Sequence, residues 1–369
     1  MTEHLAPRSL LPAVWEALWP PVLALLLSLG VSALIIAAIG ESPPAVLLMI
    51  FRQGLSSTDG FAHVLFDATP LILAGLSVAY AFRAGLFNIG AEGQLYMGAF
   101  AAAALALALP DMPRPLALPL AVAAAALGGA LWGILPGLFK ARFGVHEVIS
   151  TIMLNFIAVG LTGYCVERHL KEAGQMIPHT PEIAEAYQLA PFAKGPLGPA
   201  LGLDHANPLG VSFVIALAAA AAVGLVFFRS VEGYRLRVVG QSPAAARYGG
   251  LSVGAVTIRA MAVAGALAGL VGVHEVLLYR HRFLDNFSTG LGFMGVAVAL
   301  MGRNHPLGII LAALLFGFLD RGALEIDIFT EVPRELIVVM QAVIILFVVS
   351  IGEIARRRRR RRRLQEVRA

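Results

Sequence analysis

Polar side chains interrupt an apolar sequence at residues 87–94, which read Phe-Asn-Ile-Gly-Ala-Glu-Gly-Gln. Asn88, Glu92 and Gln94 stand among glycines there, at the predicted start of a membrane-spanning stretch. A carboxylate inside a bilayer costs about 2.5–3.5 kcal/mol on insertion scales, so Glu92 must face protein or water. Two interpretations are equally open. Either these side chains, with Asn155 in a later apolar stretch, line or support a path for a polar solute, or they join helices by hydrogen bonds.

A second polar stretch, residues 240–250, has the composition of a short capped helix. Ser242 is a good N-cap, Pro243 suits the first helical position, and Gly249 is placed to stop the helix. Such a short helix does not persist alone in water, so the rest of the chain or a partner must hold it. The stretch predicts either a docking element for another protein or an ordinary surface turn. The helix comprises Ser242, Pro243, Ala244, Ala245, Ala246, Arg247, Tyr248 and Gly249.

Several kinds of chemistry are disfavoured by what the sequence lacks. None of its lysines lies in a GxxxxGK[ST] pattern, so no Walker loop is present to hold a nucleotide. The His-Glu pairs at 146–147 and 274–275 have no histidine at position i+4, so the zinc face of a metalloprotease helix is missing. A single cysteine, Cys165, cannot form a cysteine metal cluster. We therefore expect no catalytic residue, cofactor or metal in this chain.

The elements that position these residues are predicted to be membrane helices. Of 369 residues, 58% are hydrophobic and 14% charged, whereas soluble domains have about 25% charged residues. A bilayer core needs about 20 apolar residues per helix, and about ten stretches qualify. The sequence predicts an all-α, polytopic transmembrane helical bundle. The spans cover roughly residues 18–40, 62–82, 86–109, 116–139, 147–166, 209–228, 257–279, 286–302, 305–320 and 335–353.

Basic residues predict the orientation of the chain. The arginine run 356–363 follows the last span, and such runs favour the cytoplasmic side of a membrane near anionic lipid rather than nucleic acid. An even number of spans then places both termini in the cytoplasm. Five further arginines between residues 229 and 259 mark a cytoplasmic connection. We expect an N-terminal cytoplasmic segment at 1–17, a transmembrane domain at 18–355 and a basic cytoplasmic tail at 356–369.

Three stretches resemble a known transporter family. Residues 83–94 read RAGLFNIGAEGQ and resemble the signature of the ATP-binding-cassette (ABC) permeases for branched-chain amino acids, simple sugars and nucleosides. Residues 144–155, GVHEVISTIMLN, and 302–308, GRNHPLG, are similar to the nucleoside and simple-sugar branch. The resemblance covers most of residues 60–353. It implies an importer permease, with 18–355 as the permease domain and the helix at 242–249 as the ATPase-coupling helix.

The same resemblance implies what the chain carries and what it assembles with. The expected solute is small and polar, a nucleoside or simple sugar, imported into the cytoplasm across the bacterial plasma (inner) membrane. The expected partners are ABC ATPase subunits that use the ATP, a second permease subunit that is a paralogue, and an extracytoplasmic substrate-binding protein. The lipid bilayer surrounds the multi-pass chain, and no nucleic acid is expected.

Two other functions compete with the ABC permease. One is an ion-coupled secondary transporter that uses Glu92 as a proton or sodium site. Its uptake would stop with uncouplers while ATP is intact, whereas a permease depends on a separate ATPase. The other is a membrane enzyme, which needs a convergent catalytic set that the sequence does not offer.

Overall fold

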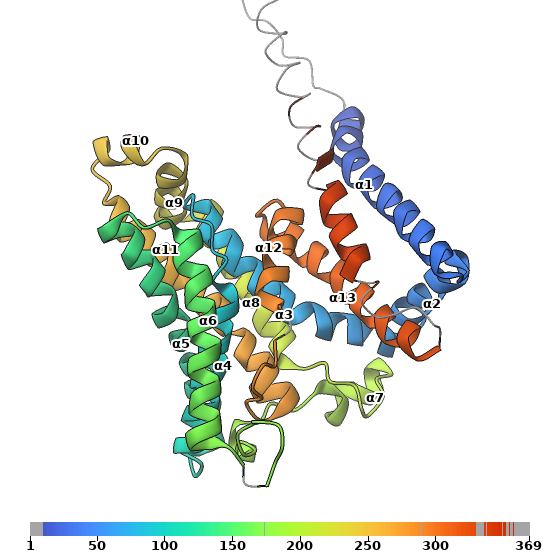
Figure 1. Cartoon of the computed structure of the whole chain (residues 1–369), viewed down its shortest axis with the longest axis horizontal. Coiled ribbons are helices and arrows are strands. Elements are labelled where there is room, and N and C mark those ends of the chain that lie inside the picture. The colour runs from blue at the N-terminus through green and yellow to red at the C-terminus, as the bar shows by residue number, and fades with distance from the viewer. Residues whose placement is uncertain are drawn as a thin grey trace, which may run out of the picture. The chain divides into compact units, whose positions relative to one another are not determined.

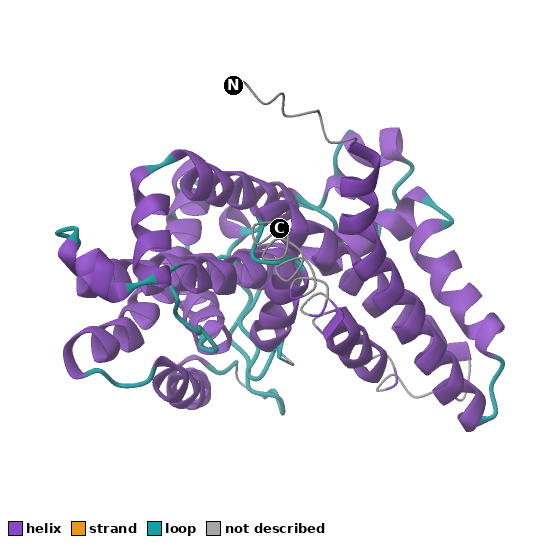
Figure 2. Ribbon diagram, turned by 90° about the horizontal axis from the view of Figure 1, so that it is seen from above, coloured by secondary structure: helices purple, strands orange, loops and turns teal. Residues whose placement is uncertain are grey.

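A computed structural model describes residues 10–329, except 173 and 289, together with scattered positions between 336 and 357. In this part of the chain nearly all regular structure is helical, as Figure 2 shows. The exceptions are two isolated β-bridges, His179 with Leu284 and Pro191 with Gly210. The predicted all-α class is therefore confirmed. The basic tail, apart from Arg357, lies outside the described residues.

Thirteen α-helices are numbered along the described residues (Figure 1). They are α1 (Leu10–Ile39), α2 (Pro43–Leu55), α3 (Thr58–Arg83), α4 (Ala91–Ala108), α5 (Arg114–Phe143), α6 (Glu147–Cys165), α7 (Leu197–Leu201), α8 (Val211–Arg229), α9 (Val231–Gln241), α10 (Pro243–Tyr248), α11 (Val253–Gly269), α12 (Leu291–Met301) and α13 (Pro306–Phe329). Two π-helical segments, η1 (Val166–Leu170) and η4 (Val273–Arg280), follow α6 and α11. Two 3₁₀ turns, η2 (Glu185–Tyr187) and η3 (Phe192–Lys194), lie between α6 and α8.

Six of the described helices are long and apolar enough to cross a membrane. They are α3, α5, α6 with η1, α8, α11 with η4, and the Pro306–Ala323 part of α13. A seventh span results if Leu26–Ile39 and Pro43–Leu55, which meet at 118°, form one broken span. A polytopic bundle is thus confirmed, but the predicted count of about ten spans is not. One reason is α12, whose 11 residues extend about 16 Å, only half of a bilayer core.

Two predicted spans begin later than their apolar sequence does. Helix α4 starts at Ala91 instead of residue 86, and α12 starts at Leu291 instead of residue 286. Gly85, just after the end of α3, and Gly290, directly before α12, have φ of 73° and 98°, a left-handed conformation that glycine adopts without steric cost. Both spans therefore begin with a stretch of non-helical backbone, and these two breaks frame the candidate site.

The chain divides into two compact units, Met1–Arg52 with Gly322–Ala369, and Gln53–Arg321. In the first unit, Ile50 of α2 packs against Gly322 of α13. In the second unit α3 is central: 89% of its most apolar stretch is buried, against 22% for α5. All residues of the candidate site belong to the second unit. The predicted boundaries at residues 17 and 355 stay predictions.

Helices α5 and α11 approach closely through glycines, as the GxxxG spacing of Gly129, Gly133 and Gly137 predicts. A Cβ atom added at Gly129 would lie 2.1 Å from the Gly265 carbonyl oxygen, and one at Gly265 would lie 2.2 Å from the Gly129 oxygen. No side chain fits between these backbones.

Gly265→Val is therefore expected to destabilise the protein by about 3 kcal/mol or more, because overpacking a tight contact typically costs 1–3 kcal/mol. Thermal unfolding of the purified protein in detergent measures the loss. Gly160→Val is the matched control, because nothing lies within 4 Å of a Cβ atom added there. Equal unfolding temperatures for the two variants would show that α5 and α11 do not need this contact.

Candidate functional site

Between α3 and α4, the C-terminus of α3 is capped and the chain then turns into the start of α4. Leu86 N–H donates to the Ala81 carbonyl (3.1 Å) and Gly85 N–H donates to the Phe82 carbonyl (3.0 Å). This pair of bonds, with Gly85 in the left-handed region, is a Schellman motif. The chain then runs as non-helical backbone until Gly90, which caps α4.

Asn88 and Gln94 lock this turn by pairing with each other. Asn88 Nδ2 donates to Gln94 Oε1 (2.9 Å), and Gln94 Nε2 donates to Asn88 Oδ1 (3.1 Å). The same Asn88 oxygen accepts Gly90 N–H (3.1 Å), and Asn88 Nδ2 also reaches Ser77 Oγ in α3 (3.4 Å). Both amide side chains are buried, with 0% and 1% exposed. Their polar atoms are thus satisfied within the protein.

Asn155 joins α6 to the same turn. Its Oδ1 accepts Gly93 N–H (2.8 Å), and its Nδ2 donates to the Ile89 carbonyl (3.0 Å). These backbone groups have no hydrogen-bond partner within α4, because they lie at its start. The Asn155 side chain supplies the missing partners. A Cβ atom at Gly93 would lie 2.9 Å from Asn155 Oδ1, so glycine permits this approach.

Glu92 links the starts of α4 and α12. Ser288 Oγ donates to Glu92 Oε1 (2.6 Å), and Gly292 N–H donates to Glu92 Oε2 (2.6 Å). Its carboxylate lies in the first turn of α4 and at the first turn of α12, where the free N–H groups of a helix favour negative charge. Gly292 has no room for a side chain, because its Cβ atom would lie 2.2 Å from Glu92 N. Glu92 therefore faces protein, one of the two surroundings that its charge requires.

The structure brings all four predicted path residues, Asn88, Glu92, Gln94 and Asn155, to the start of α4. Each has protein partners, which favours the helix-joining interpretation; a role beside a solute path stays a prediction. The sequence analysis missed Ser288 and Gly292. Ser288 and Gly290, just ahead of the apolar stretch that starts at 291, are the signal of a helix start that could have revealed this region.

Further polar side chains are buried near the start of η4. His274 is 1% exposed, its Nδ1 lies 3.0 Å from Ser212 Oγ, and its ring stacks on Phe66 at 4.4 Å. Glu275 pairs with Arg280 at 3.1 Å. The polar side chains of the His-Glu pair at 274–275 thus have protein partners. Among the described residues, no group of three or more His, Cys, Asp or Glu side chains could hold a metal ion.

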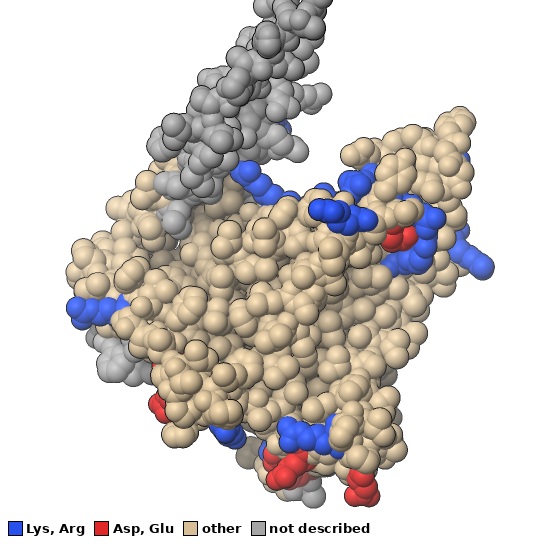
Figure 3. Space-filling view, turned by 180° about the vertical axis from the view of Figure 1, so that it is seen from behind, with Lys and Arg blue, Asp and Glu red and all other residues tan. Residues whose placement is uncertain are grey.

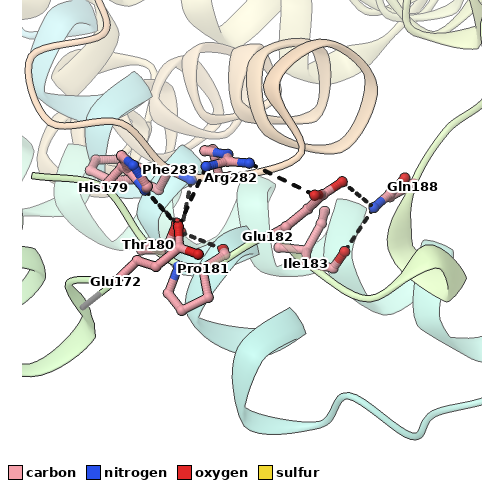
Figure 4. A network of polar contacts seen from close by, with 9 residues as sticks. All are labelled: Glu172, His179, Thr180, Pro181, Glu182, Ile183, Gln188, Arg282 and Phe283. Atoms are coloured by element: carbon pink, nitrogen blue, oxygen red, sulfur yellow. Dashed lines mark hydrogen bonds and ion pairs between the residues drawn. The ribbon is translucent and has the colours of Figure 1, made fainter. Parts of the chain in front are cut away.

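The segment between α6 and α8 is fastened to the backbone that leads into α12 (Figure 4). Arg282 forms ion pairs with Glu172 (3.6 Å) and Glu182 (3.7 Å). Thr180 N–H donates to the Phe283 carbonyl (2.9 Å), and Phe283 N–H donates back to Thr180 Oγ1 (3.0 Å). These contacts hold the non-helical approach to α12 in place.

Neighbouring His281 lies at the end of η4. Burial lowers the pKa of His281, and the nearby Glu182 only partly opposes this effect. The imidazole is therefore neutral at pH 7.

The predicted short helix at 242–249 is present as α10. Ser242 caps it by accepting Ala245 N–H at Oγ (3.2 Å), and Pro243 takes the first helical position. The helix ends before Gly249 as predicted, but the left-handed residue is Gly250, with φ of 76°. Ala246 is the only buried residue of α10, whereas Tyr248 is 96% exposed.

Charged side chains are distributed unevenly between the two ends of the second unit. Figure 3 shows several Lys and Arg side chains and little acidic surface at the end that carries α9 and α10, whereas most visible Asp and Glu side chains lie at the opposite end together with further Lys and Arg. Near α10 the basic residues include Arg235 and Arg259, which share Glu232 at 3.3 Å and 3.5 Å. This distribution agrees with the predicted cytoplasmic side for α10.

A polytopic bundle in which two apolar helices, α4 and α12, follow stretches of non-helical backbone is typical of a membrane transporter. Comparison with known protein families defines the class of this protein. Residues 60–349 match the sequence model of a family described as branched-chain amino acid transport system, permease component. The chain belongs to this permease family. It is a multi-pass membrane protein of the ABC permease type.

Three curated relatives cover most of the chain. It is 39% identical over 332 residues to the guanosine ABC transporter permease protein NupP of Bacillus subtilis (89% of this chain, 92% of the relative). It is 34% identical to the glucose ABC transporter permease protein TsgB13 of Haloferax volcanii (94% and 90%). It is also 34% identical to the nucleoside ABC transporter permease protein NupB of Lactococcus lactis (89% of each). No solved structure is significantly similar to the chain.

Proposed function

We propose that this permease subunit carries a nucleoside into the cytoplasm across a bacterial plasma membrane, driven by separate ABC ATPase subunits. The observation that carries the proposal is the 39% identity, over 89% of the chain, to a permease named for guanosine. A simple sugar is the second candidate, because the relative named for glucose is 34% identical over 94% of the chain. In the structure, both carboxylate oxygens of Glu92, the residue that an ion-coupled transporter would use, accept hydrogen bonds from protein.

Uptake by the complete transporter in proteoliposomes tests this function. With the cognate binding protein outside and ATP inside, labelled guanosine is expected to accumulate, and glucose is expected not to compete. Competition by glucose and not by nucleosides would instead support the sugar. Uptake that needs an ion gradient and no ATPase subunit would overturn the proposal and support a secondary transporter that uses Glu92.

We also propose that the permease pairs with a paralogue. Bacillus subtilis has two relatives named for guanosine, NupP and NupQ, to which the chain is 39% and 28% identical. Lactococcus lactis likewise has NupB and NupC, at 34% and 27%. The stoichiometry of the purified transporter tests this pairing. An extracytoplasmic substrate-binding protein completes the proposed assembly.

The chain itself is proposed to bind no ATP, because it lacks a Walker loop. It is also proposed to carry no catalytic residue or cofactor. ATP hydrolysis by the purified chain, freed of other subunits, would contradict this proposal. The four residues at the start of α4 are proposed to support the solute path by holding its helices, as their bonds to protein suggest.

We further propose that α10 is the ATPase-coupling helix. The support is its cap, its exposure and its place among basic residues at the predicted cytoplasmic end. Tyr248 is expected to anchor the contact, because exposed aromatic side chains supply much of the binding energy of interfaces.

Cysteine crosslinking tests this docking in a Cys165→Ala background. Ala245→Cys, at an exposed position, is expected to crosslink to the ATPase. Ala246→Cys is the matched control, because its side chain is 0% exposed and faces the permease itself. Equal crosslinking from both positions, or none from Ala245→Cys in any nucleotide state, would mean that α10 does not dock as proposed.

A further inference from the structure

Two glycines bring the backbone of α9 directly against the end of α3. A Cβ atom at Gly240 would lie 2.5 Å from the Arg83 carbonyl oxygen and 2.9 Å from Gly85 N. A Cβ atom at Gly85 would in turn lie 3.0 Å from Gly240 Cα. We call this the glycine contact, formed by Gly85 and Gly240. Both residues also touch solvent, so the contact lies at the surface of the bundle and not in its core.

On one side, the glycine contact is joined rigidly to α10. Gly240 is the second-last residue of α9, and the next helix begins two residues after α9 ends. Ser242 serves both helices: its N–H donates to the Val238 carbonyl (3.0 Å), and its Oγ accepts Ala245 N–H (3.2 Å). No flexible linker separates the helices, so a force on α10 reaches Gly240 without being absorbed.

Helix α9 is also held by its neighbours. Leu236 and Val239 are buried, with 0% and 2% exposed, and Arg237 donates from its guanidinium to the Phe227 carbonyl at the end of α8. Arg83, at the end of α3, lies over the Phe227 ring at 4.7 Å. These contacts restrict α9 to small movements against the end of α3.

On the other side, the glycine contact adjoins the break that positions α4. Gly85 is the left-handed residue of the motif that ends α3, and Asn88 follows it by three residues. The Asn88 and Gln94 pair fixes the turn to α4, and Glu92 fixes α4 to α12. A displacement of Gly85 therefore reaches the starts of α4 and α12.

We propose that the glycine contact transmits movement of α10 to the break between α3 and α4. The proposal rests on the docking of α10 to the ATPase. Close backbone contact is needed because packed elements pass on sub-ångström shifts only when no compliant side chain lies between them. Gly85 and Gly240 are thus positioning residues for transport, with no contact to solute or nucleotide.

Gly240→Ala tests this transmission in the assembled transporter. Transport is expected to fall on the order of tenfold, because the added methyl group forces the two backbones apart. Stimulation of ATP hydrolysis by the loaded binding protein is expected to be lost, while basal hydrolysis and the crosslink from Ala245→Cys persist. A role in folding alone would reduce the amount of transporter without separating hydrolysis from transport.

The control is Gly254→Ala at the start of α11, where the nearest atom to an added Cβ is 3.5 Å away, an ordinary contact. It is expected to transport normally. Gly85→Asn tests the contact from the other side, because asparagine tolerates the left-handed conformation. Wild-type coupling in Gly240→Ala or in Gly85→Asn overturns the proposal. If Ala245→Cys fails to crosslink to the ATPase in a permease that keeps Gly85 and Gly240, the proposed docking of α10 is wrong instead.

Discussion

Replacing Ala246 with proline is expected to abolish transport by uncoupling α10 from the ATPase. Ala246 N–H donates to the Ser242 carbonyl (3.0 Å), a bond that proline cannot make. Proline inside a helix costs about 3 kcal/mol, and a helix as short as α10 has no other turns to maintain its shape. Transport and substrate-stimulated ATP hydrolysis are expected to fall together. The expected loss is at least about tenfold, because a factor of ten corresponds to only about 1.4 kcal/mol.

Ala244→Gln is the matched control for this variant. Ala244 is exposed on the same helix, and glutamine is a good helix former, so α10 is expected to stay intact. The amount of Ala246→Pro protein in the membrane and its unfolding temperature show whether the bundle has survived. A folded Ala246→Pro variant that transports at the wild-type rate would exclude α10 as the coupling element.

Much of the fold follows from local sequence. Apolar length predicts the long spans, because a bilayer accepts only helices that satisfy their own backbone. The cap of α10 is equally local: Ser242 and Pro243 adjoin the helix that they start. The late starts of α4 and α12 were less visible, because Leu86 and Phe287 are as apolar as any residue within a helix. Apolar composition alone does not show where a span stops being helical.

The partners of the site could not be predicted, because they lie far apart along the chain. Glu92 bonds to Ser288 and Gly292, which are 196 and 200 residues away. The sequence required a partner for this carboxylate but could not say which one. The glycine contact is less predictable still, because Gly85 and Gly240 are recognised only once the backbones that they join are in place.

The partners of Glu92 bear on the two interpretations of this carboxylate. A carboxylate that binds solute directs its oxygens toward the path, whereas both oxygens of Glu92 accept short bonds from the start of α12. Charge-assisted bonds of this kind are about twice as strong as neutral ones. The arrangement therefore favours a role in which Glu92 holds α12 to α4 and shapes the path indirectly.

Glu92→Gln is expected to reduce transport on the order of tenfold and the free energy of unfolding by about 1–3 kcal/mol. The amide retains the shape of the side chain but removes the charge that the starts of α4 and α12 stabilise. Glu167→Gln is the control, because Glu167 is an exposed carboxylate paired with Lys171 at 3.0 Å, and exposed pairs contribute little.

A double-mutant cycle with Ser288→Ala separates the two roles of Glu92. If Glu92 acts through its bond to Ser288 Oγ, the losses of stability are expected to be non-additive by about 1 kcal/mol, because Glu92→Gln weakens the same charge-assisted bond that Ser288→Ala removes. If Glu92 instead contacts the solute, the stabilities are expected to add, and Glu92→Gln is expected to raise the KM for transport while Ser288→Ala leaves it unchanged. Additive stabilities with such a KM effect would contradict the helix-joining role and assign the carboxylate to the solute path.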